Sequence, residues 1–361
     1  MKKIYNFSAG PSMLPIDVMT EAKKNFKYWN NLSYSIMEIS HRSSYFLDMI
    51  EEAESNLREL LNIPDHYKIL FTHGGARGQF SVIPMNLLHN NNYADYICSG
   101  YWSQAAATEA KKYCIANEVH VINDINNKIV ITPMKNWKIH DSSCYVHYCF
   151  NETISGLAIY DIPNWNNKFV ICDCSSSLLS QTINIEDYSL IYASAQKNIG
   201  LSGITLIIIR EDLIGLSKQN VPSILDYHYL FMNQSMFNTP STYSWYICSL
   251  VFKWLKNLGG IEVIEKINKE KAHHLYHVID NSDFYVNDIH PDNRSIMNVV
   301  FRLKNPFLEP TFLQQSTNIG LLFLNNHKIL GGIRASIYNS MPLCGVKKLA
   351  KFMKNFEKKY G

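Results

Sequence analysis

Short apolar runs that alternate with amphipathic segments constrain the fold of this chain most strongly. Between residues 45 and 260, we expect strands at 67–72, 94–98, 144–149, 169–173, 190–194 and 204–210. Several of these runs lack a polar alternation, as is typical of strands that helices cover on both faces. One intervening segment carries apolar residues at helical spacing: Phe46, Met49, Ile50, Ala53, Leu57, Leu60 and Leu61. The alternation predicts an α/β fold in which helices sandwich a mostly parallel or mixed sheet.

The pattern changes after Gly259-Gly260. We expect a long helix over about 262–281, then strands at 296–303, 320–323 and 333–337. A closing amphipathic helix places Val346, Leu349, Ala350, Met353 and Phe356 on one face. Because 361 residues favour more than one domain, we predict a large domain over 12–260 and a smaller α+β C-terminal domain over 261–361. The N-terminal segment 1–11 is expected to join them.

Composition excludes several classes of function. The 34 lysines and arginines nearly balance 31 acidic residues, which argues against a nucleic-acid binder with a concentrated basic face. The eight cysteines form no C-x-x-C pair, so we expect neither a metal site nor a disulfide framework. The segment after Met1-Lys2-Lys3 lacks the apolar core of a signal peptide, and the longest apolar run, near 204–209, is too short for a membrane span. We therefore expect a cytoplasmic protein that binds neither membranes nor nucleic acid.

Asp173 and Lys197 are the strongest candidates for chemistry. Asp173 ends the apolar run 169–172, and Lys197 follows the next run in Ala195-Gln196-Lys197-Asn198. The carboxyl ends of strands are where open α/β sheets bind their ligands. Pyridoxal phosphate (PLP) needs a lysine for a Schiff base and a carboxylate beside its pyridine nitrogen. A surface lysine and a helix-capping aspartate remain the alternative interpretation of this pattern.

Two further features indicate anion binding. The segment His73-Gly74-Gly75-Ala76-Arg77-Gly78 follows a strand and opens a helix, where backbone amides can approach a phosphate. An ordinary tight turn explains this segment equally well. Cationic groups are scattered along the chain and would suit a multiply charged anion if they converged, although each alone reads as an exposed charge. They are His41, Arg42, Arg77, His327, Lys328 and Arg334.

Several segments in order resemble the phosphoserine aminotransferase family over essentially the whole chain. These segments span 6–11, 37–42, 74–80, 147–153, 195–198, 235–240 and 331–339. The resemblance implies the fold type I of PLP-dependent transferases in class V, working as a homodimer. It also implies transfer of an amino group from L-glutamate to 3-phosphohydroxypyruvate by a ping-pong mechanism. The products would be O-phospho-L-serine and 2-oxoglutarate, in serine biosynthesis and, in many bacteria, also in pyridoxine (vitamin B6) biosynthesis.

The resemblance assigns a role to each matching residue. Lys197 would bond to PLP and move the proton, and Asp173 would pair with the pyridine nitrogen. The remaining cofactor contacts would be Ala76, Arg77, Trp102 stacked on the ring, Thr153 and Gln196, with Asn238 and Thr239 reaching the phosphate from the partner subunit. Arg334 would hold the substrate α-carboxylate. The distal phosphate or carboxylate would fall to His41, Arg42, Arg77, His327 and Lys328.

Two positions depart from the family pattern. Ala76 stands where close relatives often have glycine, and Lys328 stands where the family usually has arginine. Lysine keeps the charge but loses the planar two-pronged contact with an anion. We therefore expect binding of the phosphorylated substrate to be weaker than in an arginine-bearing relative, by about 1 kcal/mol.

Three other functions compete with this interpretation. A cysteine desulfurase needs a mobile cysteine beside the cofactor, but the segment 314–332 contains none. An alanine–glyoxylate type of aminotransferase, which handles uncharged substrates, has no use for so many cationic groups. A regulatory protein without catalysis would not need Lys197, Asp173 and Arg334 together.

Overall fold

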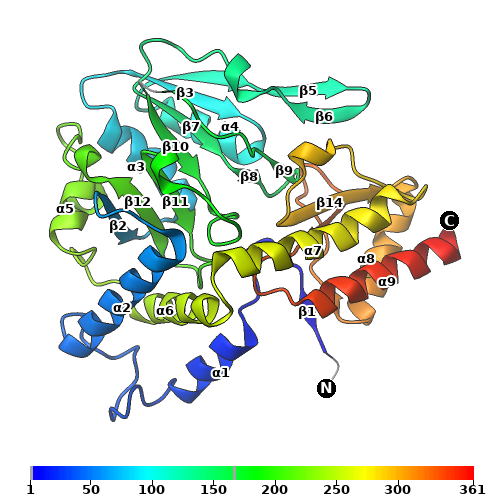
Figure 1. Cartoon of the computed structure of the whole chain (residues 1–361), viewed down its shortest axis with the longest axis horizontal. Helices are drawn as coiled ribbons and strands as arrows, with labels where there is room; N and C mark the ends of the chain where they lie inside the picture. Colours follow the sequence, from blue (N-terminus) through cyan, green and yellow to red (C-terminus); the bar gives the residue numbers. More distant parts are fainter. Residues whose placement is uncertain (1–2, 166–167) are drawn as a thin grey trace.

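A seven-stranded sheet forms the centre of the larger part of the molecule (Figure 1). The computed structural model describes residues 3–165 and 168–361, so the first two residues of segment 1–11 lie outside the description. The strand order is β2-β12-β11-β10-β7-β3-β4, and all neighbours are parallel except β12, which is antiparallel to both β11 and β2. This confirms the mixed, mostly parallel sheet. The strands are β2 (Tyr67–Thr72), β3 (Tyr93–Cys98), β4 (Ile115–His120), β7 (Tyr145–Cys149), β10 (Phe169–Asp173), β11 (Leu190–Ser194) and β12 (Thr205–Arg210).

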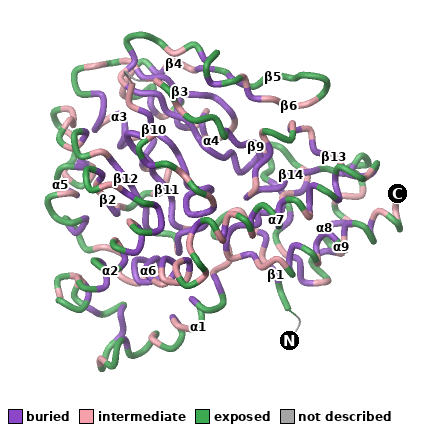
Figure 2. Tube along the Cα trace, in the orientation of Figure 1, coloured by how far each residue is buried: buried purple, intermediate pink, exposed green. Residues whose placement is uncertain are grey.

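Helices cover both faces of this sheet, which explains the unbroken apolar runs. On one face, α3 (Gly75–Leu87), α4 (Tyr101–Ala110) and α5 (Tyr227–Met232) share a core with Ile171. On the other face, α1 (Ile16–Lys24), α2 (Ser44–Leu61) and α6 (Thr242–Asn257) pack with Val170 and Cys172. The central strands are accordingly buried along most of their length (Figure 2).

The expected strands missed one member of the sheet and a hairpin beside it. Strand β4 lies at the sheet edge, and its sequence Ile-Ala-Asn-Glu-Val-His buries only some of its side chains. An edge strand has one neighbour and a partly exposed face, so it leaves no continuous apolar run. The hairpin of β5 (Ile122–Ile125) and β6 (Lys128–Ile131) follows it and projects toward the C-terminal part (Figure 1).

The C-terminal part has its own apolar core. As the spacing predicts, a long helix α7 (Ile261–Asp280) leads into it and α9 (Leu343–Tyr360) closes it. Between them lie α8 (Glu309–Asn318) and a three-stranded antiparallel sheet of β13 (Tyr285–Val286), β14 (Asn298–Leu303) and β16 (Ile333–Ser336). Helix α7 contributes to both cores, since Ile264 packs with the large sheet and Leu275 with the C-terminal strands. The domain boundary at 260/261 stays a prediction.

One expected strand of this part pairs elsewhere. The strand expected at 320–323 is β15 (Leu321–Leu322), and it lies parallel to β1 (Tyr5–Asn6) rather than in the three-stranded sheet. The N-terminal segment therefore crosses from the C-terminal core to the large sheet, where Ser12 donates to the Lys197 carbonyl at 2.6 Å. A second small pair, β8 (Asn151–Glu152) with β9 (Leu157–Ala158), follows β7 directly.

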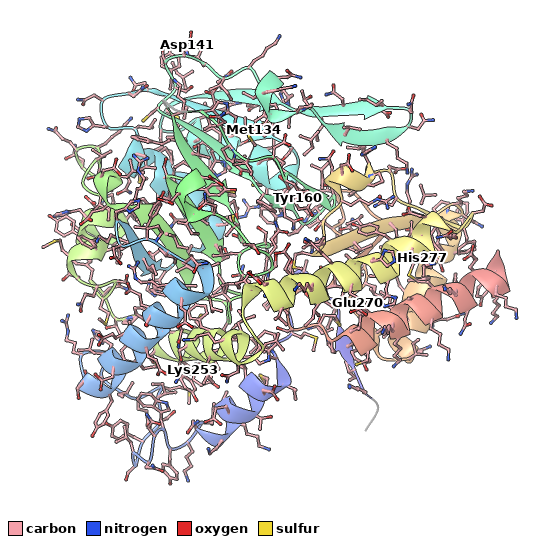
Figure 3. All side chains as sticks on the ribbon, viewed as in Figure 1. Met134, Asp141, Tyr160, Lys253, Glu270 and His277 are labelled. Atoms are coloured by element: carbon pink, nitrogen blue, oxygen red, sulfur yellow. The ribbon has the colours of Figure 1, made fainter. Side chains whose placement is uncertain are left out.

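The outer faces of the C-terminal helices are polar. Glu270 and His277 are exposed on α7, next to the lysine-rich α9 (Figure 3). Within the described residues, no helix combines the length and apolar character needed to cross a membrane.

Candidate active site

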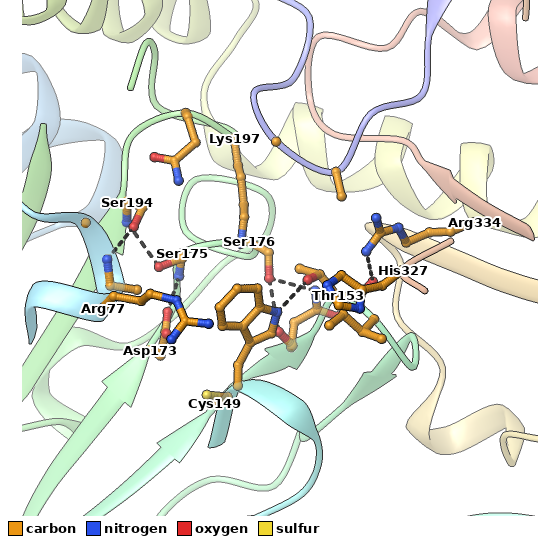
Figure 4. Close-up of a pocket in the computed structure, with 18 of the residues that line it drawn as sticks. Arg77, Cys149, Thr153, Asp173, Ser175, Ser176, Ser194, Lys197, His327 and Arg334 are labelled. Carbon is orange, nitrogen blue, oxygen red and sulfur yellow. Dashed lines mark hydrogen bonds between the residues drawn. The ribbon is translucent and has the colours of Figure 1, made fainter. Parts of the chain in front are cut away.

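A cavity of about 430 Å³ lies at the carboxyl ends of the central strands (Figure 4). This is the sheet edge at which open α/β folds bind ligands. Of the residues singled out from the sequence, it brings together Ala76, Arg77, Trp102, Thr153, Asp173, Gln196, Lys197, His327 and Arg334. They come from both parts of the chain, because Arg334 lies on β16 and His327 on the loop before it.

Asp173 and Lys197 approach this cavity from adjacent parallel strands. Asp173 is the last residue of β10, and Lys197 follows β11 in the turn 195–200. The Asp173 carboxylate accepts the Ser175 N–H at 2.8 Å. Burial raises the pKa of Asp173, and the nearby Lys197 opposes this rise. Burial likewise lowers the pKa of Lys197, which makes its amine more available as a nucleophile and a base.

The N-terminus of α3 is open toward the cavity. Gly74 and Gly75 have φ values of 91° and 63°, which other residues adopt only with strain. The N-cap residue Gly74 has no side chain to cap this helix, and one first-turn amide, the Ala76 N–H, donates to Ser194 Oγ at 2.7 Å. The free amides and the positive end of the helix suit a phosphate group.

Trp102 and Arg77 form one wall. The Trp102 indole N–H donates to Thr153 Oγ1 at 2.9 Å, which fixes the plane of the ring. The Arg77 guanidinium lies 5.3 Å from the centre of that ring and donates to the Tyr101 hydroxyl at 3.1 Å. An aromatic face and a cation thus lie side by side.

The adjoining part of the cavity, linked to this wall through Thr153 and Tyr101, carries a second arginine, Arg334, together with His327. Arg334 donates to the Thr153 carbonyl at 3.1 Å, and burial lowers its pKa. His327 packs its ring 5.6 Å from that of Tyr101. In Figure 4, Lys197 extends into the space between this part of the cavity and the Asp173 side.

Comparison with known proteins identifies the family. The profile described as "Aminotransferase class-V" matches residues 4–349. The phosphoserine aminotransferase of Buchnera aphidicola subsp. Acyrthosiphon pisum (strain 5A) is 57% identical over 361 residues, covering 100% of both chains. That of Buchnera aphidicola subsp. Schizaphis graminum (strain Sg) is 56% identical, again over 100% of both chains. This chain belongs to the class V aminotransferases.

Solved structures of the same family have the same fold. The phosphoserine aminotransferase from Bacillus circulans subsp. alkalophilus superposes with a TM-score of 0.95 at 36% identity, covering 99% of each chain. The PLP-bound phosphoserine aminotransferase from Trichomonas vaginalis gives 0.92 at 36% identity, covering 98% of this chain and 100% of that one. The fold is therefore the fold type I of PLP-dependent transferases.

Five residues assigned from the family resemblance do not line the cavity of their own chain: His41, Arg42, Asn238, Thr239 and Lys328. Arg42, Asn238, Thr239 and Lys328 are exposed, and His41 is half-buried just before α2. Lys328 directly follows His327, which does line the cavity.

The cavity also has lining residues that the sequence did not single out as site residues. Asn151, Ser175, Ser176 and Ser194 are polar residues at or just beyond the carboxyl ends of β7, β10 and β11. The rule that draws attention to Asp173 would have found them too, since each follows an apolar run. Ala9, Gly10, Cys149 and Ile154 also line the cavity. In the described part of the chain, no group of three histidines, cysteines or acids is arranged to hold a metal ion.

Proposed function

We propose that this chain is a phosphoserine aminotransferase that uses PLP to exchange an amino group between L-glutamate and 3-phosphohydroxypyruvate. The products are O-phospho-L-serine and 2-oxoglutarate, which serve serine biosynthesis and also pyridoxine biosynthesis. The observation that carries the proposal is the convergence of Lys197, Asp173 and Arg334 on one cavity from three separate segments. The names of the relatives at 57% and 56% identity support the substrate class.

The donor set fits the cofactor. Asp173, fixed by the Ser175 N–H, offers a carboxylate to a protonated ring nitrogen. Trp102, held by Thr153, offers a flat face for stacking. The open N-terminus of α3 offers amides to a phosphate. Bound PLP supplies the electron sink that lets an amino group leave one acid and join another.

The protein residues then divide the remaining work. The Lys197 amine, with its lowered pKa, would move the proton between the substrate α-carbon and C4′ of the cofactor. Arg334 binds the α-carboxylate and so orients that carbon toward Lys197. Arg77, His327 and Lys328 receive the distal phosphate or carboxylate. Because the same cations serve both anions, the two half-reactions need little change in the shape of the cavity.

A homodimer would complete the site. His41, Arg42, Asn238 and Thr239 lie outside the cavity of their own chain and are exposed or half-buried, so they are free to contact the cavity of a partner chain. We propose that Asn238 and Thr239 bind the cofactor phosphate across the interface, and that His41 and Arg42 bind the substrate there too.

An absorption spectrum tests the proposal directly. The purified protein should show the visible band of bound PLP, and phosphoserine without any keto acid should bleach it. A band that responds only to unphosphorylated amino acids would refute the substrate assignment but keep the class V chemistry. If no band appears even after PLP is added, the proposed function is wrong.

A further inference from the structure

Glu152 has no role in the function proposed above, yet its position is unusual. It ends the short strand β8 directly before Thr153, and its side chain is fully buried at 0% exposure. A buried carboxylate is costly unless hydrogen bonds satisfy its oxygens. Here the Trp102 N–H donates to Oε2 at 3.0 Å, while the Ser103 N–H and hydroxyl donate to Oε1, each at 2.8 Å.

All three donors belong to the first turn of α4, so Glu152 caps a helix from a distant segment. A carboxylate at this position both accepts the free amides and faces the positive end of the helix. The N-terminus of α4 is therefore occupied by the Glu152 carboxylate of the same chain, whereas, among the described residues, no acidic side chain occupies the N-terminus of α3. The fit is tight, because a Cβ on Gly100 would lie only 2.5 Å from Glu152 Cδ.

The backbone of Trp102 and its ring are thus held by neighbouring residues. Glu152 holds the main-chain N–H of Trp102, and Thr153 holds its indole N–H at 2.9 Å. The same Thr153 offers its carbonyl to Arg334 at 3.1 Å. A shift of Glu152 would move the ring that faces the cofactor and the arginine that faces the substrate together.

We propose that Glu152 is a positioning residue that anchors the main chain of Trp102, and with it the position of the ring over the cavity, and so controls how tightly and in which orientation PLP is held. This inference rests on the proposed function, because it assumes that PLP stacks on Trp102. It goes beyond simple helix capping, which would affect the stability of the fold but not the cofactor.

The variant Glu152→Gln tests this with little change in shape. The amide keeps one acceptor oxygen but turns an NH2 group toward backbone N–H donors, so one side of the cap is lost. The matched control is Glu265→Gln. Glu265 also accepts a backbone N–H and a hydroxyl, both from Thr182, at 2.8 and 2.6 Å, but it lies on α7 and does not line the cavity.

The readouts are the PLP dissociation constant of cofactor-depleted protein, the visible circular dichroism of bound PLP, and the unfolding free energy. For Glu152→Gln, we expect the dissociation constant to rise about tenfold, as for one lost charge-assisted bond, and the dichroism at saturation to weaken. For Glu265→Gln, both cofactor readouts should stay within about twofold of wild type, even where the unfolding free energy falls.

Two results would overturn the inference: unchanged cofactor readouts in Glu152→Gln, or equal changes in both variants. If Glu152→Gln does not fold, Glu152→Asp replaces it, since this change keeps the carboxylate but draws it back by one methylene from the Trp102 and Ser103 donors. It should raise the dissociation constant about threefold, and no rise would again overturn the inference. Wild-type protein that binds no PLP at all would instead refute the proposed function, and the inference with it.

Discussion

Mixing one inactive variant with one that binds PLP weakly should restore activity if the active site is shared between subunits. One parent is Lys197→Ala, which removes the amine that the reaction needs. The other is the double variant Asn238→Ala/Thr239→Ala, whose residues are exposed and lie outside their own cavity. The double variant loses two donors to the cofactor phosphate. At about 1.5 kcal/mol each, its affinity for PLP should fall on the order of a hundredfold.

The expected recovery follows from the geometry. In a mixed dimer, one site combines the intact Lys197 of the double variant with the intact Asn238 and Thr239 of the partner. The other site carries all of the defects. Random exchange of equal amounts puts half of the dimers in the mixed form, so a quarter of all sites are intact, which predicts about 25% of wild-type activity on the statistics of a symmetric dimer.

The assay is phosphoserine-dependent formation of glutamate from 2-oxoglutarate. It is run at a PLP concentration that saturates the wild type but not the double variant. Each parent alone and the two mixed without subunit exchange serve as controls. If Asn238 and Thr239 act within their own chain, no mixed dimer contains an intact site. Activity that stays at the average of the two parents would therefore refute the shared site.

Three other perturbations test separate parts of the structure. Lys328→Arg should lower the Michaelis constant for the phosphorylated substrate about fivefold by restoring a two-pronged contact, and an unchanged constant would contradict this. Lys271 is 0% exposed and donates to the carbonyls of Ile337, Tyr338 and Met341 at 2.9, 2.8 and 3.1 Å. Lys271→Met should therefore lower the free energy of unfolding, measured in urea at pH 6, by about 3 kcal/mol. Three buried carbonyls would lose their donor, and this cost exceeds the gain from no longer burying a charge; an unchanged urea midpoint of unfolding would contradict this. Burial lowers the pKa of His147 from 6.5 to about 3, so between these values the unfolded chain binds a proton that the folded chain does not. Stability should fall as pH falls through this window, by about 1.4 kcal/mol per unit from this group. In the variant His147→Gln, the free energy of unfolding from urea titrations should therefore fall less steeply between pH 6.5 and 4.5 than in the wild type. An equal pH dependence of the two proteins would contradict this.

The sequence alone predicts that Asp173 lies beside the turn that carries Lys197, because two local rules apply to both residues. Each residue follows a buried apolar run, and parallel neighbouring strands deliver their carboxyl ends to one edge. Ile171, Cys172 and Asp173 pair in register with Leu190, Ile191 and Tyr192, so the two ends meet. The same rules could not give the antiparallel direction of β12, because an apolar run has the same composition in either direction.

The contacts that shape the walls of the cavity lie beyond such rules. Trp102 meets Glu152 and Thr153 across about fifty positions of sequence, and the pairing leaves no periodicity in either segment. Nor does anything in segment 1–11 indicate that β1 pairs with β15. These contacts depend on which elements the fold brings together. They can be identified only once the order of the strands in the sheet is known, and from the sequence they can be predicted only through a resemblance to a known family. Glu152 is an example. It lies within a segment that resembles the family, but the resemblance assigns it no role; its role follows only from its three hydrogen bonds to α4.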